Sequence, residues 1–521
     1  MSLQLKTGTS WDDVWRRCRE AAPEAFGADR ILNLHEGEWQ PTGTPGDHVT
    51  PVDGSPLPGP PRLTADQARA AVAHAARQHA DFARVDLDER RRRVSAAVQA
   101  MREHRDTLAL LLVWEIGKPW RLACADVDRC LDGVDWYVDE IERMVEGRSP
   151  LPGPVSNIAS WNYPMSVQVH AELVQLLAGN AVVAKTPSQG GFHCLTLAHA
   201  LMAREDLPVT LLSGVGSQLG EALIRADEIG ALAFVGGRAN GRRAATTLAD
   251  TGKRHMLEQE GLNAWGLWGY SDWDSLAAHL TKGFEYAKQR CTAYPRLVVQ
   301  RELFDAFLET YLPVVREKIA FGHPLAVEDA DDDFPELTFG PVISAAKAHD
   351  LRAKLDEAVR GGGIPLYRGD VAEDARLLDG QDASAYVAPA AVLHPPKSSA
   401  LMHAEPFGPL DTVVVVDTEA ELLSEMNASN GALVASVACD DDETAHRLAD
   451  ELQAFKVGIN KPRSRGDRDE VFGGAGASWK GAFVGGDLLV QAVTEGPPGE
   501  RLAGNFPGWS LRPLGHGAGV A

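Results

Sequence analysis

The sequence predicts an α/β protein with parallel sheets, and three observations support that fold class. In the middle third of the chain, short apolar stretches alternate with segments of helical periodicity, which is typical of parallel strands joined by helices. A second alternation of the same kind follows between residues 297 and 416. The 521 residues, 44% of them hydrophobic, allow roughly two to four domains with buried cores.

The front of the chain is expected to be irregular at first and helical afterwards. The first sixty residues are rich in Pro and Gly and predict an arm laid over a domain. Thr64 and Gln67 form a capping-box pattern, so a helix should begin after Thr64. Amphipathic periodicity predicts further helices at about 88–105, 108–115 and 120–144, and Gly117 should end the second of these.

The two predicted sheets follow. The strands of the first are expected at 181–184, 209–212, 231–235 and from 255 onward, with helices at 192–203, 217–225 and 239–248. The strands of the second are expected at 297–299, 390–393 and 412–416, with helices at 302–319 and 344–359. Ser344 should cap the last of these helices. From about Pro497 the chain is expected to form an extended arm.

Charge and cysteine content exclude several classes of protein. Asp and Glu outnumber Lys and Arg by 73 to 51, a net charge of −22, so phosphate backbones and anionic lipids would repel the chain and we expect neither nucleic acid nor membrane partners. No apolar run reaches the roughly 20 residues of a membrane helix, and no secretory signal is recognisable. The six scattered Cys form neither a disulfide framework nor a zinc site, so we expect a cytoplasmic protein without a structural metal.

A glycine-rich segment follows the second predicted strand and reads GVGSQLG over residues 214–220. Gly216 and Gly220 would let the backbone approach a phosphate, whose charge a helix N-terminus favours. The spacing differs from the dinucleotide fingerprint, so turn glycines without a ligand explain it equally well. Lys185 ends another predicted strand, at the edge where such sheets bind nucleotides, although a solvated surface Lys is the simpler interpretation of any single lysine.

Eight short motifs occur in one order along the chain. They are Glu115-Ile116-Gly117-Lys118-Pro119; Trp161-Asn162-Tyr163-Pro164; Ala178-Gly179-Asn180 with Lys185-Thr186-Pro187-Ser188; Phe234-Val235-Gly236-Gly237; Glu258-Gln259-Glu260-Gly261; Gln289-Arg290-Cys291; Glu405-Pro406-Phe407-Gly408-Pro409; and Phe472-Gly473-Gly474. In this order and at these separations they resemble the aldehyde dehydrogenase superfamily over roughly residues 30–490. The chain would be a divergent member of that family.

The resemblance implies two α/β domains and a small arm. Residues 1–146 and 155–257 would form a parallel-sheet, Rossmann-like nucleotide-binding domain, and residues 258–483 the catalytic domain. Residues 147–154 and 484–521 would form a short bridging or oligomerisation arm. Because the hairpin that joins subunits in the family is shortened here to residues 147–154, we expect a homo-oligomer, and a dimer rather than a tetramer.

The resemblance also implies a cofactor, NAD or NADP. The implied cofactor-binding residues are Lys185, Ser188, Gln189, Gly216, Gly220, Phe234, Gly236, Gly237, Glu405 and Phe407. Lys185 would contact the adenosine ribose, and Glu405 the nicotinamide ribose. Gln189 stands where the family often has Glu; a neutral amide does not repel a 2′-phosphate, so NADP should be tolerated or preferred. Gly237 stands where the family usually has Ser, so one hydroxyl contact to a phosphate is lost.

By the same resemblance, three residues would carry the chemistry. Cys291 would be the nucleophile that forms a thiohemiacetal and then a thioester, which divides one difficult step into two. Asn162, with the backbone N–H of Cys291, would stabilise the oxyanion. Glu258 would be the general base that activates water for hydrolysis. Glu260 lies close enough to confuse this assignment, and Gln259, Glu260 and Leu262 depart from the family pattern.

Other interpretations remain open. A catalytically silent structural or binding protein could use the same fold, and a non-redox thioesterase or acyl transferase could use Cys291. The substrate would be a small aldehyde that the sequence does not identify. Residues near the expected substrate tunnel include Tyr163, Val167, His170, Arg290 and Thr292. The nearby loop at 459–472 carries Arg463, Arg465, Arg468 and three acidic residues, which are expected to pair with one another rather than grip a substrate carboxylate.

Overall fold

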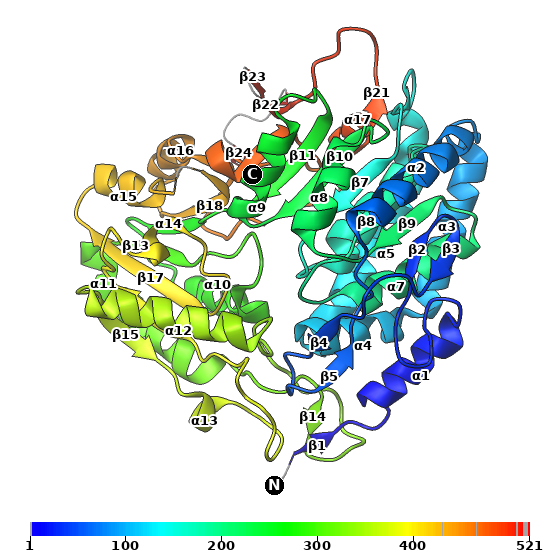
Figure 1. Cartoon of the computed structure of the whole chain (residues 1–521). Helices are drawn as coiled ribbons and strands as arrows, with labels where there is room; N and C mark the ends of the chain where they lie inside the picture. Colours follow the sequence, from blue (N-terminus) through cyan, green and yellow to red (C-terminus); the bar gives the residue numbers. More distant parts are fainter. Residues whose placement is uncertain (1–2, 430, 465, 507–508, 514–518, 521) are drawn as a thin grey trace.

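The computed structural model describes residues 3–429, 431–464, 466–506, 509–513 and 519–520 (Figure 1). Two large sheets organise the chain, one of ten strands and one of eight. Most strand pairs in the interior of both sheets are parallel. The predicted α/β class with parallel sheets is therefore confirmed.

The parallel centre of the ten-stranded sheet has the order β11-β10-β7-β8-β9. These strands are β7 (Val155–Ile158), β8 (Val182–Lys185), β9 (Val209–Leu212), β10 (Ala231–Gly236) and β11 (Arg254–Gln259). The chain runs outward from β7 through β8 to β9 and then returns to the other side of β7 for β10 and β11. The strand order therefore reverses beside β7, and the crevice beyond the carboxyl ends of strands at such a reversal is where α/β sheets bind ligands.

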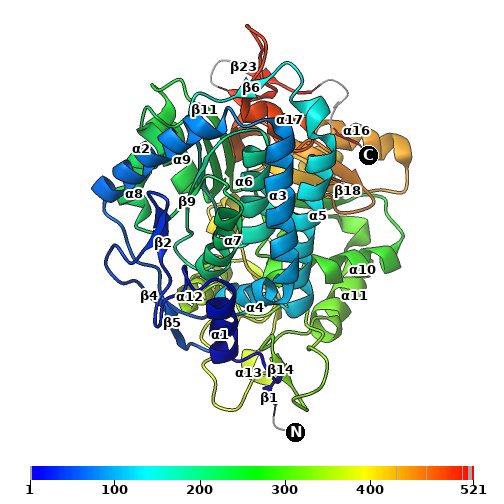
Figure 2. The ribbon, with the colours of Figure 1, turned by 90° about the vertical axis from the view of Figure 1, so that its right-hand side faces the viewer.

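Helices cover both faces of this sheet. One layer contains α6 (His170–Leu177) and α7 (Phe192–Arg204), and the other α2 (Ala65–Phe82), α8 (Gly216–Arg225) and α9 (Arg238–Leu248). Outside α6 and α7 lie α3 (Leu87–Glu103), α4 (Arg105–Ile116) and α5 (Trp120–Met144), as Figure 2 shows. The predicted capping box is present, because Gln67 N donates to Thr64 Oγ1 and Thr64 N donates to Gln67 Oε1. Gly117 ends α4 at φ 69°, a conformation that glycine adopts without strain.

Both ends of the chain contain more regular structure than the sequence predicted. The expected irregular arm includes α1 (Trp11–Ala21), whose first turn is capped by the Ser10 side chain. Near it, β2 (Asn33–His35) and β3 (Glu38–Gln40) extend the sheet beyond β9. At the other edge, β20 (Trp479–Ala482), β22 (Gly504–Phe506) and β23 (Trp509–Leu511) continue it antiparallel beyond β11. The described strands of the C-terminal arm therefore pair with strands of the same chain, β22 and β23 in this sheet and β24 (Gly519–Val520) in the other.

The eight-stranded sheet has the order β15-β16-β17-β13-β12-β18-β19-β24. Its strands are β12 (Ala264–Leu267), β13 (Arg296–Gln300), β15 (Ile364–Arg368), β16 (Ala390–Leu393), β17 (Leu410–Val416), β18 (Ala432–Ala438), β19 (Ala454–Ile459) and β24 (Gly519–Val520). One core lies under α10 (Trp273–Gly283), α11 (Phe304–Pro313) and α12 (Ala345–Arg360). A second core lies under α14 (Ala400–His403), α15 (Glu419–Met426) and α16 (Asp442–Asp450).

Short elements complete the fold: β1 (Gln4–Leu5) with β14 (Ala326–Val327), β4 (Asp47–Val49) with β5 (Pro56–Pro58), β6 (Ser149–Pro150) with β21 (Thr494–Glu495), and the helices α13 (Val371–Asp374) and α17 (Asp487–Ala492). The β6–β21 pair joins the two segments predicted as the arm. The domain boundaries themselves stay a prediction. One strand crosses the predicted boundary, because β20, from the segment 258–483, pairs with β11 of the first sheet.

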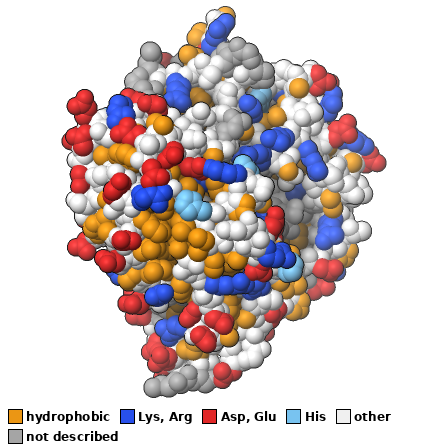
Figure 3. Space-filling view, turned by 90° about the vertical axis from the view of Figure 1, so that its left-hand side faces the viewer, with side chains coloured by type: hydrophobic (Ala, Val, Ile, Leu, Met, Phe, Trp, Pro, Cys, Tyr) orange, Lys and Arg blue, Asp and Glu red, His pale blue; other side chains and the backbone are white. Residues whose placement is uncertain are grey.

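The surface around α10, α11 and β15 is rich in hydrophobic side chains (Figure 3). Trp273, Phe304 and Leu308 are half-buried there, and Ile364 is 55% exposed. Within the described chain, no helix has the length and apolarity that would let it cross a bilayer. Nor do the described residues bring together three or more His, Cys, Asp and Glu side chains in a group suited to a metal ion.

Candidate active site

Two adjoining cavities lie beyond the carboxyl ends of β7, β8, β10 and β11. We call them the small cavity, of about 360 Å³, and the large cavity, of about 1060 Å³. They share Gln189, Gly236 and Gly237 in their walls. The small cavity is lined by Asn162, Glu258, Cys291, Glu405 and Phe407, and the large one by Lys185, Ser188, Gly216, Gly220 and Phe234. The fold thus brings all thirteen residues predicted from the sequence to one site.

Cys291 lies in the loop that leads into β13. It is half-exposed, whereas the other five cysteines, all within the described residues, are buried. The side-chain amide of Asn263 donates to the carbonyl oxygens of Cys291 and Ala293, both at 2.8 Å. These bonds fix the loop backbone on both sides of residue 292, so the thiol is held at the cavity wall.

The turn that precedes Cys291 has an uncommon backbone. Tyr286, Ala287 and Lys288 have φ of 57°, 52° and 56°, in the left-handed region that side chains disfavour. The buried Lys288 ammonium donates to Asp411 and, at 3.1 Å, to the carbonyl of Tyr294. Burial lowers the pKa of Lys288 and raises the pKa of Asp411, and the contact between the two groups opposes both shifts. A buried ion pair therefore anchors the strained turn.

Asn162 connects the end of β7 to the same loop. It is 6% exposed, and its Nδ2 donates to the carbonyl of Gln289 at 3.1 Å, while Ser160 Oγ donates to its Oδ1 at 2.8 Å. Gln289 is fixed in turn, because its Oε1 accepts the backbone N–H of Ile343 at 2.9 Å. A carboxamide nitrogen carries two N–H groups, so Asn162 retains a second donor for a group in the small cavity.

Glu258 and Glu260 have different surroundings. Glu258 is 3% exposed, and within the described structure neither of its carboxylate oxygens has a hydrogen-bond partner. Glu260 Oε1 accepts the backbone N–H of Glu405 at 2.7 Å. Both residues line the small cavity, but only Glu258 has neither carboxylate oxygen engaged in a hydrogen bond within the described structure, so it is the better candidate for a general base.

Glu405 provides a test of whether the site fits a nicotinamide cofactor. Its side chain is 8% exposed, and its Oε1 has no hydrogen-bond partner in the described structure. Burial raises the pKa of Glu405 well above its usual range, and the negative charge of Glu260 raises it further, while Lys347 opposes the shift. Buried polar atoms are normally hydrogen-bonded, and the hydroxyls of a ribose would supply the partner that Glu405 Oε1 lacks. Phe407 (φ 52°) lies beside it, with its ring 5.8 Å from that of Trp161.

Lys185 and Gly237 have room for the other end of such a ligand. Lys185 ends β8, and its Nζ donates to the carbonyl of Thr186 at 2.8 Å. Burial lowers the pKa of Lys185 to about 8. Gly237 precedes α9, and a Cβ placed on it would meet nothing within 4 Å. The residues present therefore fit a dinucleotide that runs from the large cavity into the small one.

Two lysines of the small cavity were not predicted from the sequence. Lys347 and Lys354, seven residues apart on α12, line the small cavity, and both contact Asp350, at 3.2 and 2.8 Å. The sequence indicated the helix and its Ser344 cap, and the Ser344 side chain accepts the N–H of Lys347 as expected. It carried no signal for which face of the helix meets the cavity, because that depends on how the two sheets are arranged.

The expected tunnel residues divide into two groups. Tyr163 and Val167 line the small cavity, whereas His170, Arg290 and Thr292 do not. His170 instead packs against the ring of Tyr137, and Arg290 donates to the carbonyl of Gly283 at 2.9 Å. In the loop at 459–472, Arg463 pairs with Glu470 at 2.8 Å and Arg468 with Asp132 at 3.8 Å, while Arg465 lies outside the described residues. Arg463 thus pairs within the loop, as expected, whereas Arg468 pairs with a carboxylate outside it.

Comparison with known proteins identifies a matching family and structures of similar fold. A sequence profile of the aldehyde dehydrogenase family matches residues 39–495. Similar solved structures include an NADP-dependent glyceraldehyde-3-phosphate dehydrogenase from Bacillus halodurans in complex with NADP (TM-score 0.79, 24% identity, 89% of this chain and 98% of that chain). A betaine aldehyde dehydrogenase from Staphylococcus aureus in complex with NAD+ gives a TM-score of 0.80 at 23% identity over 92% and 96% of the two chains. An NAD-dependent aldehyde dehydrogenase from Sinorhizobium meliloti gives 0.79 at 25% over 89% and 93%. Since the profile spans most of its length, the chain belongs to the aldehyde dehydrogenase family.

Proposed function

We propose that this chain oxidises an aldehyde to a carboxylic acid with NAD or NADP, through a thioester on Cys291. The observation that carries the proposal is that Cys291, Glu258 and Asn162 line one cavity of about 360 Å³, which adjoins a larger cavity suited to a dinucleotide. The family and the NAD- or NADP-bound state of similar structures support the same reaction.

In the first half of the reaction, the Cys291 thiolate adds to the aldehyde carbon. The carbonyl oxygen becomes an oxyanion that the second N–H of Asn162 and the backbone N–H of Cys291 would stabilise. A nicotinamide cofactor would supply the acceptor for the hydride that leaves this carbon, and the thioester would remain on Cys291. Lys185 and Glu405 would hold the two riboses of the cofactor, and Gly236 with the N-terminus of α9 its pyrophosphate.

In the second half, Glu258 takes a proton from water as the water oxygen adds to the thioester carbon. The C–S bond then breaks, which releases the carboxylic acid and returns the Cys291 thiolate. The buried carboxylate of Glu258, with no competing hydrogen bond in the described structure, supports this role. Gln189, which contacts both cavities, supports tolerance of or preference for NADP, because it places no negative charge beside a 2′-phosphate.

The first experiment is formation of NAD(P)H at 340 nm with aliphatic, aromatic and carboxyl-bearing aldehydes, each with NAD+ and NADP+. Turnover is expected in the wild type and not in Cys291→Ala. A clear preference for NAD+ in initial rates would contradict the interpretation of Gln189. Cofactor binding without turnover of any aldehyde would favour a silent protein on this fold, and cofactor-free hydrolysis of an activated ester would favour a thioesterase. The homodimer and the cytoplasmic location stay predictions; the hydrophobic surface around α11 is consistent with a subunit contact.

A further inference from the structure

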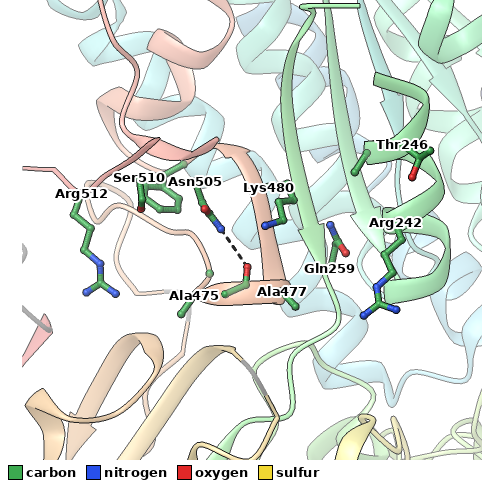
Figure 4. Close-up of a pocket in the computed structure, with 13 residues that line it drawn as sticks. Arg242, Thr246, Gln259, Ala475, Ala477, Lys480, Asn505, Ser510 and Arg512 are labelled. Atoms are coloured by element: carbon green, nitrogen blue, oxygen red, sulfur yellow. Dashed lines mark hydrogen bonds between the residues drawn. The ribbon is translucent and has the colours of Figure 1, made fainter. Parts of the chain in front are cut away.

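A third cavity, of about 620 Å³, lies outside the two cavities already described. We call it the basic pocket. Figure 4 shows α9 on one side of it, β20 in the middle and the C-terminal strands on the other side. Arg242 projects from α9, Lys480 from β20, and Arg512 follows β23. Three segments that are far apart in the sequence therefore each bring one cation to the same pocket.

Among the described residues that line the basic pocket, none carries a carboxylate. Within the described part of the chain, none of the three cations forms an ion pair or a side-chain hydrogen bond, although most Arg and Lys side chains elsewhere do so. In a chain with 73 acidic and 51 basic residues, an arrangement of cations alone is not what random placement of charge would give. Like charges held together repel, and an anion bound among them removes that repulsion.

Hydrogen bonds and close packing fix the walls of the pocket. Asn505 Nδ2 donates to the carbonyls of Gly476 and Trp479, at 3.1 and 2.8 Å, and so ties the loop at 474–477 to β22 (Figure 4). Gln259 is 2% exposed and lines the pocket beside Gly241, where an added Cβ would come within 2.5 Å of the Gln259 side chain. The glycine thus allows the amide to pack against α9.

The size and charge of the pocket specify a class of ligand. A volume of about 620 Å³ is in the range of small-molecule sites and exceeds what a single inorganic anion fills. Cations that come from both sides and from the middle of the pocket are best matched by an anion with groups at more than one end. We propose that the basic pocket binds an organic or condensed polyanion with at least two phosphate or carboxylate groups, at a site separate from the active site.

The pocket borders the active site. Arg242 and Thr246 also line the large cavity, and Gln259, the residue after Glu258, also lines the small cavity. A ligand in the basic pocket would contact residues of both cavity walls without occupying either cavity. The proposal does not depend on the proposed oxidation, because binding is measured without an aldehyde and without turnover.

The test is isothermal titration calorimetry of the full chain at low ionic strength, with pyrophosphate and citrate as separate probes of phosphate and carboxylate chemistry. Inorganic phosphate serves as the comparison with one group. Lys480→Met removes the cation at the centre of the pocket, and Arg512→Met removes an exposed one whose loss does not endanger folding. Arg243→Met is the matched control, since Arg243 is the next residue on α9 and lines the large cavity but not the basic pocket.

We expect one-to-one binding of at least one probe, tighter than that of inorganic phosphate. Loss of a charge-assisted contact should weaken the affinity for that probe by about tenfold or more in Lys480→Met and measurably in Arg512→Met. The affinity should not change in Arg243→Met. Equal affinity in the wild type and both pocket variants would overturn the proposal. The proposal would also be overturned if only Arg243→Met bound the probe more weakly and NADP+ displaced the probe, because the probe would then bind in the large cavity. Binding weaker than that of inorganic phosphate for both probes would also overturn it.

Discussion

The strained turn before Cys291 leads to a quantitative prediction for Lys288→Met. The substitution keeps most of the apolar volume of the side chain and removes the ammonium. Within the described structure, Asp411, 1% exposed, then keeps one side-chain partner, the hydroxyl of Tyr311, which donates to it at 2.8 Å. Loss of one partner of a buried ion pair costs about 3–5 kcal/mol in the free energy of unfolding. We expect a loss in that range at pH 7 to 8.

The loss should depend on pH in a defined direction. Burial already raises the pKa of Asp411, and removal of the Lys288 charge raises it further. The folded-state pKa of such a carboxyl lies above its unfolded value of about 3.9. Its contribution to stability is then complete at pH values below the unfolded pKa and is lost as pH rises through the folded pKa. The deficit of Lys288→Met should therefore be small near pH 4 and grow with pH until Asp411 is ionised. Urea unfolding at several pH values measures it.

The same variant should also affect the thiol. Three left-handed residues store roughly 1–2 kcal/mol each, and without the Lys288 contacts the turn can relax and move Cys291. We expect slower alkylation of Cys291 by iodoacetamide, in protein that circular dichroism shows to be folded. The double variant Lys288→Met/Asp411→Asn should recover most of the stability, since no unpaired charge remains, but not the alkylation rate. If the single variant is alkylated as fast as the wild type, the ion pair does not position Cys291 and the reasoning is wrong.

Four further outcomes follow from the geometry of the site. Glu258→Gln should lower steady-state turnover by about 10²–10⁴-fold while one equivalent of NAD(P)H still forms rapidly. Loss of that rapid burst as well would mean that Glu258 is needed for formation of the thioester and not for its hydrolysis alone. Asn162→Ala should lower kcat by about 10²–10³-fold with little change in cofactor affinity, and a change in KM alone would remove it from the oxyanion site. Gly237→Ser should tighten cofactor binding severalfold, because the space beside residue 237 is open and its φ of −65° suits any residue; unchanged Kd values by fluorescence titration would contradict this. Burial lowers the pKa of Lys185 to about 8, so its charge, and with it cofactor affinity, should fall as pH rises through that value, whereas Lys185→Met should bind weakly with no such slope.

Much of the fold was predictable because local pattern and tertiary structure agree. The predicted strand at 209–212 and the predicted helix at 120–144 coincide with β9 and α5. The site residues were predictable because the motifs lie at strand ends and loops that the parallel sheets bring together. α1 was missed although Ser10 and Asp13 supply a cap, since only Val14, Cys18 and Ala21 of this highly charged helix are buried. The helix predicted at 302–319 is divided at Pro313, beyond which the chain forms a π-helical turn.

Other features depended on contacts between distant segments. The pairing of β20 with β11 and of β22 with β20 joins residues more than 20 positions apart, and nothing in their periodicity specifies the partner. The positive φ angles of Tyr286, Ala287 and Lys288 oppose the local preference of all three residues. Such a turn is stable only where tertiary contacts fix it, so it could not be deduced from the local sequence.

Two polar contacts join the segment at 405–411 to other parts of the site. Glu260 accepts the backbone N–H of Glu405, and Lys288 pairs with Asp411. Both charged residues thus bind the segment at 405–411, which also carries Phe407 and leads into β17. One contact joins this segment to Glu260, directly after the strand β11 that bears Glu258. The other joins it to the turn before Cys291. These two contacts hold the segment that bears Glu405 beside β11 and beside the turn before Cys291, and so help to keep Glu258, Cys291 and Glu405 around one cavity although Glu260 departs from the family pattern.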